Sequence, residues 1–205
     1  DIDPTYTLGQ AEMARQKILE RLKKERLLEL NDQRSMSPVL QSIAVISSET
    51  AAGYADFIAQ IENNNYGYEI HTELFQVAVQ GRNVESEVVD AFRQIQANGK
   101  HYDAVTIIRG GGSKLDLAGF DNYNIGHAIA MCRLPVIIGI GHEIDTTVSD
   151  LVAQVSLKTP TAVAGYIIDR NMKYETEILG LGFEIQENCL ATVREKRAEV
   201  EHIEY

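Results

Sequence analysis

Two apolar runs decide the fold that this sequence predicts. Val105–Ser113 reads VTIIRGGGS, and Pro135–Asp145 reads PVIIGIGHEID. Runs of Val and Ile that do not alternate with polar residues are typical of strands buried on both faces of a parallel sheet. Each run ends in glycines beside a reactive side chain, Arg109 in the first and His142 in the second. Ligands of open α/β sheets bind beyond the carboxyl ends of the strands, so neighbouring runs would bring Arg109 and His142 into one crevice.

Strand and helix patterns alternate along the rest of the chain. Further strands are expected at Ile43–Ile46 and Glu69–Val79, and amphipathic patterns predict helices after each strand. Alternation of this kind indicates right-handed crossovers between parallel strands. The predicted fold is therefore α/β, with a roughly four-stranded, mainly parallel sheet and helices on both faces. A segment from about Thr146 to Val155 is also expected to be helical.

The chain divides into three predicted regions: 1–38, 39–160 and 161–205. In the first, residues 1–8 look like the tail of a preceding strand, a helix runs from Thr7 to about Leu30, and a polar linker ends at Pro38. The second is the α/β domain. The third is one long helix with an imperfect apolar seam, which needs a partner and therefore reads as the start of a coiled coil. Its seam contains Ile168, Glu175, Ile178, Ile185 and Val193.

Composition narrows the classes of function. The 205 residues carry a formal net charge of −11, and residues 39–160 hold fourteen acids against seven basic residues. A broad basic surface for nucleic acid is excluded, so any polyanion must be held by local cations and backbone amides. No apolar run has the roughly 20 residues that a membrane span requires. The two cysteines, Cys132 and Cys189, form no CxxC pair, which favours a reducing cytoplasm.

The first candidate motif is Arg109-Gly110-Gly111-Gly112-Ser113. Glycines let the backbone approach a ligand and aim successive N–H groups at an anion, and the Arg109 guanidinium suits a phosphate. The dinucleotide pattern GxGxxG and the P-loop spacing are both absent. The alternative is an ordinary flexible turn at a strand end.

The second candidate motif is His142-Glu143-Ile144-Asp145. Histidine exchanges a proton near neutral pH, and an acid three residues later can reach the same face of a helical turn. His142 and Asp145 could therefore form a base and its orienting acid, or both could contact a phosphate or a metal. The second histidine of the zinc-protease motif is missing. The alternative is a structural pair.

A third candidate part of the crevice follows the first predicted strand. Ser47, Ser48 and Thr50 lie in a small, hydroxyl-rich loop before a helix, where exposed amides favour an anion. Asp56 falls in the first turns of that helix, where an acid more often serves as a partner of the helix dipole.

The motifs together resemble the large subunit of exonuclease VII. The resemblance covers residues 39–168 in order, through VISSETAAGYADF (45–57), VQG (79–81), RGGGS (109–113) with Asp116-Leu117, GHEID (141–145) and KTPTAVA (158–164). Residues 1–8 are similar to the end of that family's N-terminal OB-fold, and the last helix to the start of its coiled coil. Thr50-Ala51-Ala52-Gly53 departs from the TGAA of many members.

The resemblance implies a role for each candidate residue. The catalytic set would be Asp56, Arg109, His142 and Asp145, with the glycine loop as the phosphate contact. Substrate binding would extend over Ser47, Ser48, Thr50, Gly110, Gly111, Gly112, Ser113 and Glu143. The metal requirement is left open: a divalent ion such as Mg²⁺ would be bound by Asp145 and Asp56 if one is used.

The function so implied is phosphodiester hydrolysis. The family's whole enzyme degrades single-stranded DNA from both ends to oligonucleotides, with several copies of a small helical subunit as partner. The OB-fold would track the strand, so the acidic domain need hold only the scissile phosphate. Residues 1–205 alone are expected to be weak or inactive. The alternatives are a non-catalytic phosphate- or nucleotide-binding module, and an assembly scaffold that associates through its terminal helix.

Overall fold

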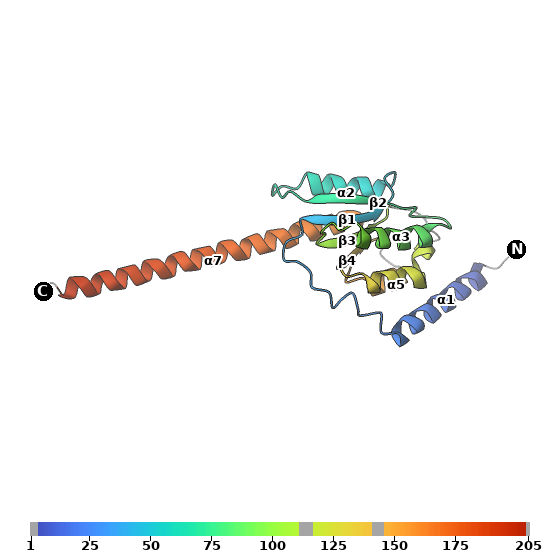
Figure 1. Cartoon of the computed structure of the whole chain (residues 1–205), viewed down its shortest axis with the longest axis horizontal. Coiled ribbons are helices and arrows are strands. Elements are labelled where there is room, and N and C mark those ends of the chain that lie inside the picture. Colours follow the sequence, from blue (N-terminus) through green and yellow to red (C-terminus); the bar gives the residue numbers. More distant parts are fainter. Residues whose placement is uncertain (1–3, 111–116, 141–145, 204–205) are drawn as a thin grey trace.

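The computed structural model describes residues 4–110, 117–140 and 146–203. A five-stranded sheet, in which every pairing is parallel, forms its centre, with strand order β2-β1-β3-β4-β5 (Figure 1). The strands are β1 (Ser42–Ser47), β2 (His71–Gln76), β3 (Ala104–Ile108), β4 (Val136–Gly139) and β5 (Val155–Ser156). The α/β fold with a long C-terminal helix is thus confirmed. The two runs that predicted it are neighbours, because Val105 pairs with Val136 and Ile108 with Gly139.

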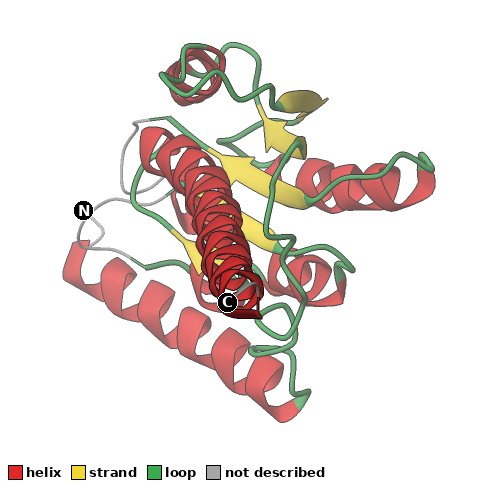
Figure 2. Cartoon of the chain, turned by 90° about the vertical axis from the view of Figure 1, so that its left-hand side faces the viewer, coloured by secondary structure: helices red, strands yellow, loops and turns green. Residues whose placement is uncertain are grey.

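The helices cover both faces of the sheet, as predicted (Figure 2). Helices α3, α5 and α6 pack on one face, and α2 and α7 on the other. Alternate strand residues enter different cores: Ala44 and Ile46 face the first, Ile43 and Val45 the second. This two-sided burial explains the unbroken Val and Ile runs. The helices are α1 (Pro4–Lys24), α2 (Ala52–Glu62), α3 (Val84–Ala97), the 3₁₀ turn η1 (Ala118–Phe120), α5 (Tyr123–Met131), α6 (Val148–Val152) and α7 (Pro160–Ile203).

The fifth strand adds one to the roughly four that the sequence predicts. The segment 146–155 was expected to be one helix, but α6 ends at Val152 and the chain then pairs as β5 with Ile137 and Ile138 of β4. A strand of two residues is too short to show any periodicity in sequence.

Helix α1 differs from its prediction at both ends. It begins at Pro4, so residues 4–8 are helical where an extended strand tail was expected, and proline is well tolerated in a first helical turn. It ends at Lys24 and not near Leu30, because Arg26 adopts a left-handed φ of 58°. The amide of Leu27 then donates to the carbonyl of Leu22 and that of Arg26 to Lys23, which closes the helix as a Schellman motif.

Helix α7 is anchored to the domain by its N-terminal part. Val163, Ala164 and Ile167 are buried against the sheet, and Asn171 both accepts from the amide of Leu40 and donates to its carbonyl. Glu175 still accepts from the Tyr68 hydroxyl. Beyond Glu175 the helix leaves the domain (Figure 1), and large apolar side chains are exposed: Ile178, Leu179, Leu181, Phe183, Ile185, Leu190, Val193 and Val200. Within the part of the chain that is described, no helix is long and apolar enough to cross a membrane.

Candidate functional site

A polar pocket lies at the carboxyl ends of the first three strands, where the sequence predicted a crevice. Its volume is about 400 Å³. Its described lining comes from three loops, those after β1, β2 and β3, and comprises Ser48, Thr50, Ala51, Ala52, Ala78, Val79, Gln80, Arg109 and Gly110. Four residues predicted for the site, Ser48, Thr50, Arg109 and Gly110, therefore share one pocket.

Arg109 supplies the cation of this pocket among the described lining residues. Its position is set by the sheet, because it directly follows β3 and its backbone amide donates to the carbonyl of Gly139 on β4. The residue is only 5% exposed. A buried guanidinium interacts with an anion more strongly than an exposed one, since water screens it less.

The first turn of α2 forms the wall beside Arg109. Ala51 precedes the helix in an extended conformation, and no side chain caps it. The first amides of a helix lack intrahelical partners and carry partial positive charge, so an uncapped start that lines a pocket favours an anion. Gly53 and Gly110 are in close backbone contact, because a Cβ on Gly53 would lie 2.5 Å from the Cα of Gly110. That approach holds the helix start against the Arg109 loop.

The hydroxyl-rich loop after β1 divides into a structural and a pocket part. Ser47 is fully buried, and its hydroxyl donates to the carbonyl of Ile108, which ties β1 to β3 below the pocket. Ser48 and Thr50 lie at the pocket surface, and their hydroxyls are 3.0 Å apart. The side chain of Gln76 holds this loop from β2, since its Oε1 accepts from the amide of Glu49 and its NH₂ donates to the Ser48 hydroxyl.

Asp56 is exposed on α2 and is not part of the pocket lining. It lies one turn before Gln60, which borders a shallow hollow with Thr159 and Thr161 at the start of α7. Because residues four apart share a helix face, Asp56 is on the side of α2 that faces α7. The structure therefore brings Arg109, Gly110, Ser48 and Thr50 together, and leaves Asp56 outside the lining of their pocket.

The remaining predicted residues lie outside the described part of the chain: Gly111, Gly112, Ser113, His142, Glu143 and Asp145. What the structure does describe is β4, which leads to His142 and is the neighbour of the strand that leads to Arg109. Among the described residues, no three His, Cys, Asp or Glu side chains gather closely enough to hold a metal ion. Of the two acids named for a metal, only Asp56 is described.

Sequence reasoning gave no role to the wall from the loop after β2. Ala78, Val79 and Gln80 line the pocket, and the amide of Ala78 is held by the carboxylate of Glu87 on α3. The sequence does contain evidence for this wall, because Gln80-Gly81 follows a predicted strand and is therefore expected at the carboxyl edge of the sheet. A larger hollow of about 580 Å³ lies between α3 and α5 and holds none of the predicted residues, so size alone does not identify the site.

These features define a class: an open parallel α/β domain with an arginine-containing polar pocket at the carboxyl edge of its sheet. The family model described as "Exonuclease VII, large subunit" matches residues 27–205. The chain belongs to the exonuclease VII large subunit family.

Curated relatives support this membership. The chain is 35% identical to the exodeoxyribonuclease 7 large subunit of Lactobacillus gasseri over 178 residues, which are 87% of this chain and 39% of that protein. It is 41% identical to that of Thermotoga sp. (strain RQ2), over 62% of this chain and 32% of that protein. It is 30% identical to that of Rhodopirellula baltica, over 96% of this chain and 44% of that protein. The chain thus spans less than half the length of these relatives.

Proposed function

We propose that this chain carries the catalytic site of a nuclease that hydrolyses phosphodiester bonds of single-stranded DNA, working from both ends to release oligonucleotides. The observation that carries the proposal is the pocket in which buried Arg109 and Gly110 meet the uncapped start of α2. A phosphate there would be held by a planar cation and backbone amides, whose stabilisation grows as charge develops in the transition state.

The proton chemistry of this proposal belongs to the end of β4. His142 acts as general base toward water or general acid toward the leaving oxygen, and Asp145 orients it or binds a metal ion. Asp56, on the side of α2 that faces α7, positions water or organises the adjoining loop. Support comes from the pairing of β3 with β4, since Arg109 and His142 follow neighbouring strands.

Replacing His142 or Arg109 with alanine tests the proposal. The variants are made in the complete large subunit assembled with the small subunit, and release is measured from single-stranded DNA labelled at the 5′ or the 3′ end. Loss of a proton-transfer group lowers turnover by about 10²–10⁴-fold, and loss of a charged phosphate donor by about 10²–10³-fold. Release of label from both substrates by the wild-type enzyme is expected.

The outcomes separate this function from the alternatives. A non-catalytic phosphate-binding module would lose affinity with Arg109→Ala and little with His142→Ala. Wild-type rates in a folded His142→Ala variant would refute the assignment of His142. Residues 1–205 alone are proposed to cleave weakly, because the three relatives named above are more than twice as long as the part they share with this chain.

We also propose that several copies of a small helical subunit bind along α7, and that the complex works in the cytoplasm. The support for binding is the exposed stripe formed by Ile178, Ile185 and Val193, which recur at helical spacing and continue the side of α7 that Ile167 and Asn171 bury in the domain. For the compartment, the support is that both cysteines are free thiols.

Replacing Ile185 with lysine tests the binding surface. The change puts a charge into an apolar contact, and we expect the small subunit to bind at least about tenfold more weakly, as for an interface residue worth more than 1.4 kcal/mol. Glu184→Lys, which places the same side chain outside the stripe, is the control. Binding is measured by titration with isolated small subunit. Equal affinities for the two variants would contradict the proposed surface.

A further inference from the structure

The hydroxyl of Ser47 makes a buried hydrogen bond directly below the pocket. Ser47 is the last residue of β1 and is fully buried, and its hydroxyl donates to the carbonyl of Ile108 at 2.8 Å. The last backbone pair between β1 and β3 lies one position earlier, at Ile46 and Ile107. Beyond Ser47 the chain turns into the loop before α2. The side chain of Ser47 therefore extends the attachment of β1 to β3 by one position.

The carbonyl that Ser47 holds belongs to the peptide group that leads into Arg109. Because a peptide bond is planar, the Ile108 carbonyl and the Arg109 amide move as one rigid unit. That unit is fixed from both sides, since its carbonyl accepts from Ser47 on β1 and its amide donates to the carbonyl of Gly139 on β4 at 3.2 Å. The direction in which the Arg109 side chain leaves the backbone depends on the orientation of this unit.

Ser47 also connects this peptide group to the wall of the pocket that follows β2. Its backbone carbonyl accepts from the amide of Val77 at 2.8 Å, and buried Val77 immediately precedes the lining residue Ala78. Together with the bond to Gly139, three hydrogen bonds thus run across the neighbouring strands β2, β1, β3 and β4. Each of the three loops that line the pocket begins at this row of bonds. Ser47 is the central member of the row and takes part in two of its three bonds.

We propose that Ser47 is a positioning residue that sets where the Arg109 guanidinium lies in the pocket. This inference rests on the proposed nuclease function, in which Arg109 holds the phosphate. Ser47 acts through the Ile108 carbonyl and not by touching DNA, since it is absent from the described lining of the pocket and is fully buried. A buried carbonyl that loses its donor turns toward another partner, and a displacement of about 1 Å at a reacting group can cost about 100-fold in rate.

A double-mutant cycle distinguishes positioning from general structural support. Ser47→Ala and Arg109→Ala are made singly and together in the complete large subunit assembled with the small subunit, and kcat/KM is measured on end-labelled single-stranded DNA. We expect Ser47→Ala to lower kcat/KM at least about tenfold in the wild-type background and less than about threefold in the Arg109→Ala background, because its effect passes through Arg109. Equal losses in both backgrounds, or a wild-type value in Ser47→Ala, would overturn the proposal.

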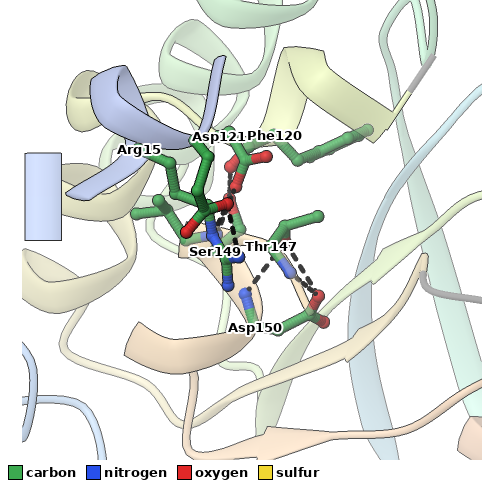
Figure 3. Close-up of polar contacts among 8 residues, drawn as sticks. Arg15, Phe120, Asp121, Thr147, Ser149 and Asp150 are labelled. Atoms are coloured by element: carbon green, nitrogen blue, oxygen red, sulfur yellow. Dashed lines mark hydrogen bonds and ion pairs between the residues drawn. The ribbon is translucent and has the colours of Figure 1, made fainter. Parts of the chain in front are cut away.

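Ser149→Ala is the matched control for burial and bond type. Ser149 is also fully buried, and its hydroxyl donates to the carbonyl of Phe120 at 2.7 Å. Figure 3 shows the group around it, in which Thr147 and Asp150 cap α6. This bond joins α6 to η1, so we expect its loss to cost the same factor in the wild-type and Arg109→Ala backgrounds. If the cost of Ser149→Ala also vanished without Arg109, the coupling of Ser47 would not be specific and the proposal would fail.

A second pair of variants separates the hydroxyl of residue 47 from the size of its side chain. Threonine and valine have nearly the same shape and differ in one hydroxyl, so Ser47→Thr and Ser47→Val share any strain from the added bulk. We expect kcat/KM to be at least about tenfold higher in Ser47→Thr, which keeps the donor to Ile108. Equal values in the two variants would refute the proposal, also where Ser47→Ala is too unstable for kinetics.

Hydrogen exchange tests the contact without activity. Peptides covering residues 104–110 are expected to exchange faster in Ser47→Val than in Ser47→Thr, because the peptide group before Arg109 has lost one of its two anchors. Identical exchange would contradict the proposed role of the hydroxyl. Should Arg109→Ala cleave DNA like wild type, the proposed function of Arg109 fails, whereas the exchange result still decides whether Ser47 fixes the backbone at Arg109.

Discussion

Replacing Gly53 with alanine is expected to abolish most of the activity and to destabilise the domain. The added Cβ would lie 2.5 Å from the Cα and 2.6 Å from the nitrogen of Gly110, and 2.7 Å from Cγ of Pro160. Two of these neighbours are backbone atoms, which cannot swing aside as a side chain can. Either the start of α2 or the Arg109 loop must therefore move.

Two opposing effects set the size of this change. Alanine is favoured over glycine inside a helix by about 1 kcal/mol, whereas overpacking of a tight contact costs about 1–3 kcal/mol. The clash exceeds the gain here, and we expect a net loss of up to about 2 kcal/mol. The effect on cleavage is larger, about 100-fold or more, because the shift separates the amides of α2 from Arg109 in the pocket.

Gly180→Ala is the matched control for Gly53→Ala. Gly180 is also a helical glycine, but a Cβ there would meet no atom within 4 Å. This variant should be as stable as wild type or gain up to about 1 kcal/mol. Urea unfolding measures stability, and release from end-labelled single-stranded DNA measures activity. If Gly53→Ala matched wild type in both assays, the close contact would not be required for the site.

The strands that carry the site could be predicted from sequence because burial on both faces leaves a strong signature. The apolar run that begins at Val105 was expected as a strand and lies in β3 (Ala104–Ile108), and Arg109 lines the pocket beyond it. Strand position and the carboxyl-edge rule together place a residue in space without any contact being known. The positions of Ser48, Thr50 and Gly110 could be predicted for the same reason.

What could not be predicted depends on contacts between segments far apart in the sequence. No local sequence pattern indicates that the Ser47 hydroxyl bonds to β3, or that Ser47 and Ser48 have different roles. The exposure of Asp56 outside the pocket follows from how α2 lies against α7, which periodicity does not specify. Strand β5 has the same origin, since its pairing requires a partner strand fixed only by the folded chain.

The contacts of Asn31 could not be predicted from sequence either, and its substitution is the second change for which we expect a large effect. The sequence placed it in a polar linker, yet its side chain is fully buried. Its NH₂ group donates to the carbonyls of Ile129 and Leu134, and its carbonyl accepts from the amides of Val136 and Gln154. All four hydrogen-bonding positions of the amide are used, so one side chain joins the segment after α1 to the end of α5, the start of β4 and the approach to β5.

Asn31→Ala is expected to lower the free energy of unfolding by about 4 kcal/mol. The substitution leaves up to four backbone groups without a partner, each worth about 1–3 kcal/mol when buried and unsatisfied, although water entering the space recovers part of the loss. A loss of this size is a large fraction of the 5–15 kcal/mol typical of a domain. Asn65→Ala, at an exposed turn, is the control and should change stability by less than about 0.5 kcal/mol.

Asn31→Asp separates the donating half of this side chain from the accepting half. Its carboxylate still accepts from the two amides but sets oxygen against the carbonyls of Ile129 and Leu134, so burial and repulsion raise its pKa above the unfolded value of about 3.9. An acid with a raised folded-state pKa destabilises the fold as pH rises through that range. We therefore expect the deficit of Asn31→Asp relative to wild type to be small near pH 4 and to grow toward pH 7 in urea unfolding. A deficit independent of pH would show that the two donated bonds do not hold the segment after α1 to Ile129 and Leu134.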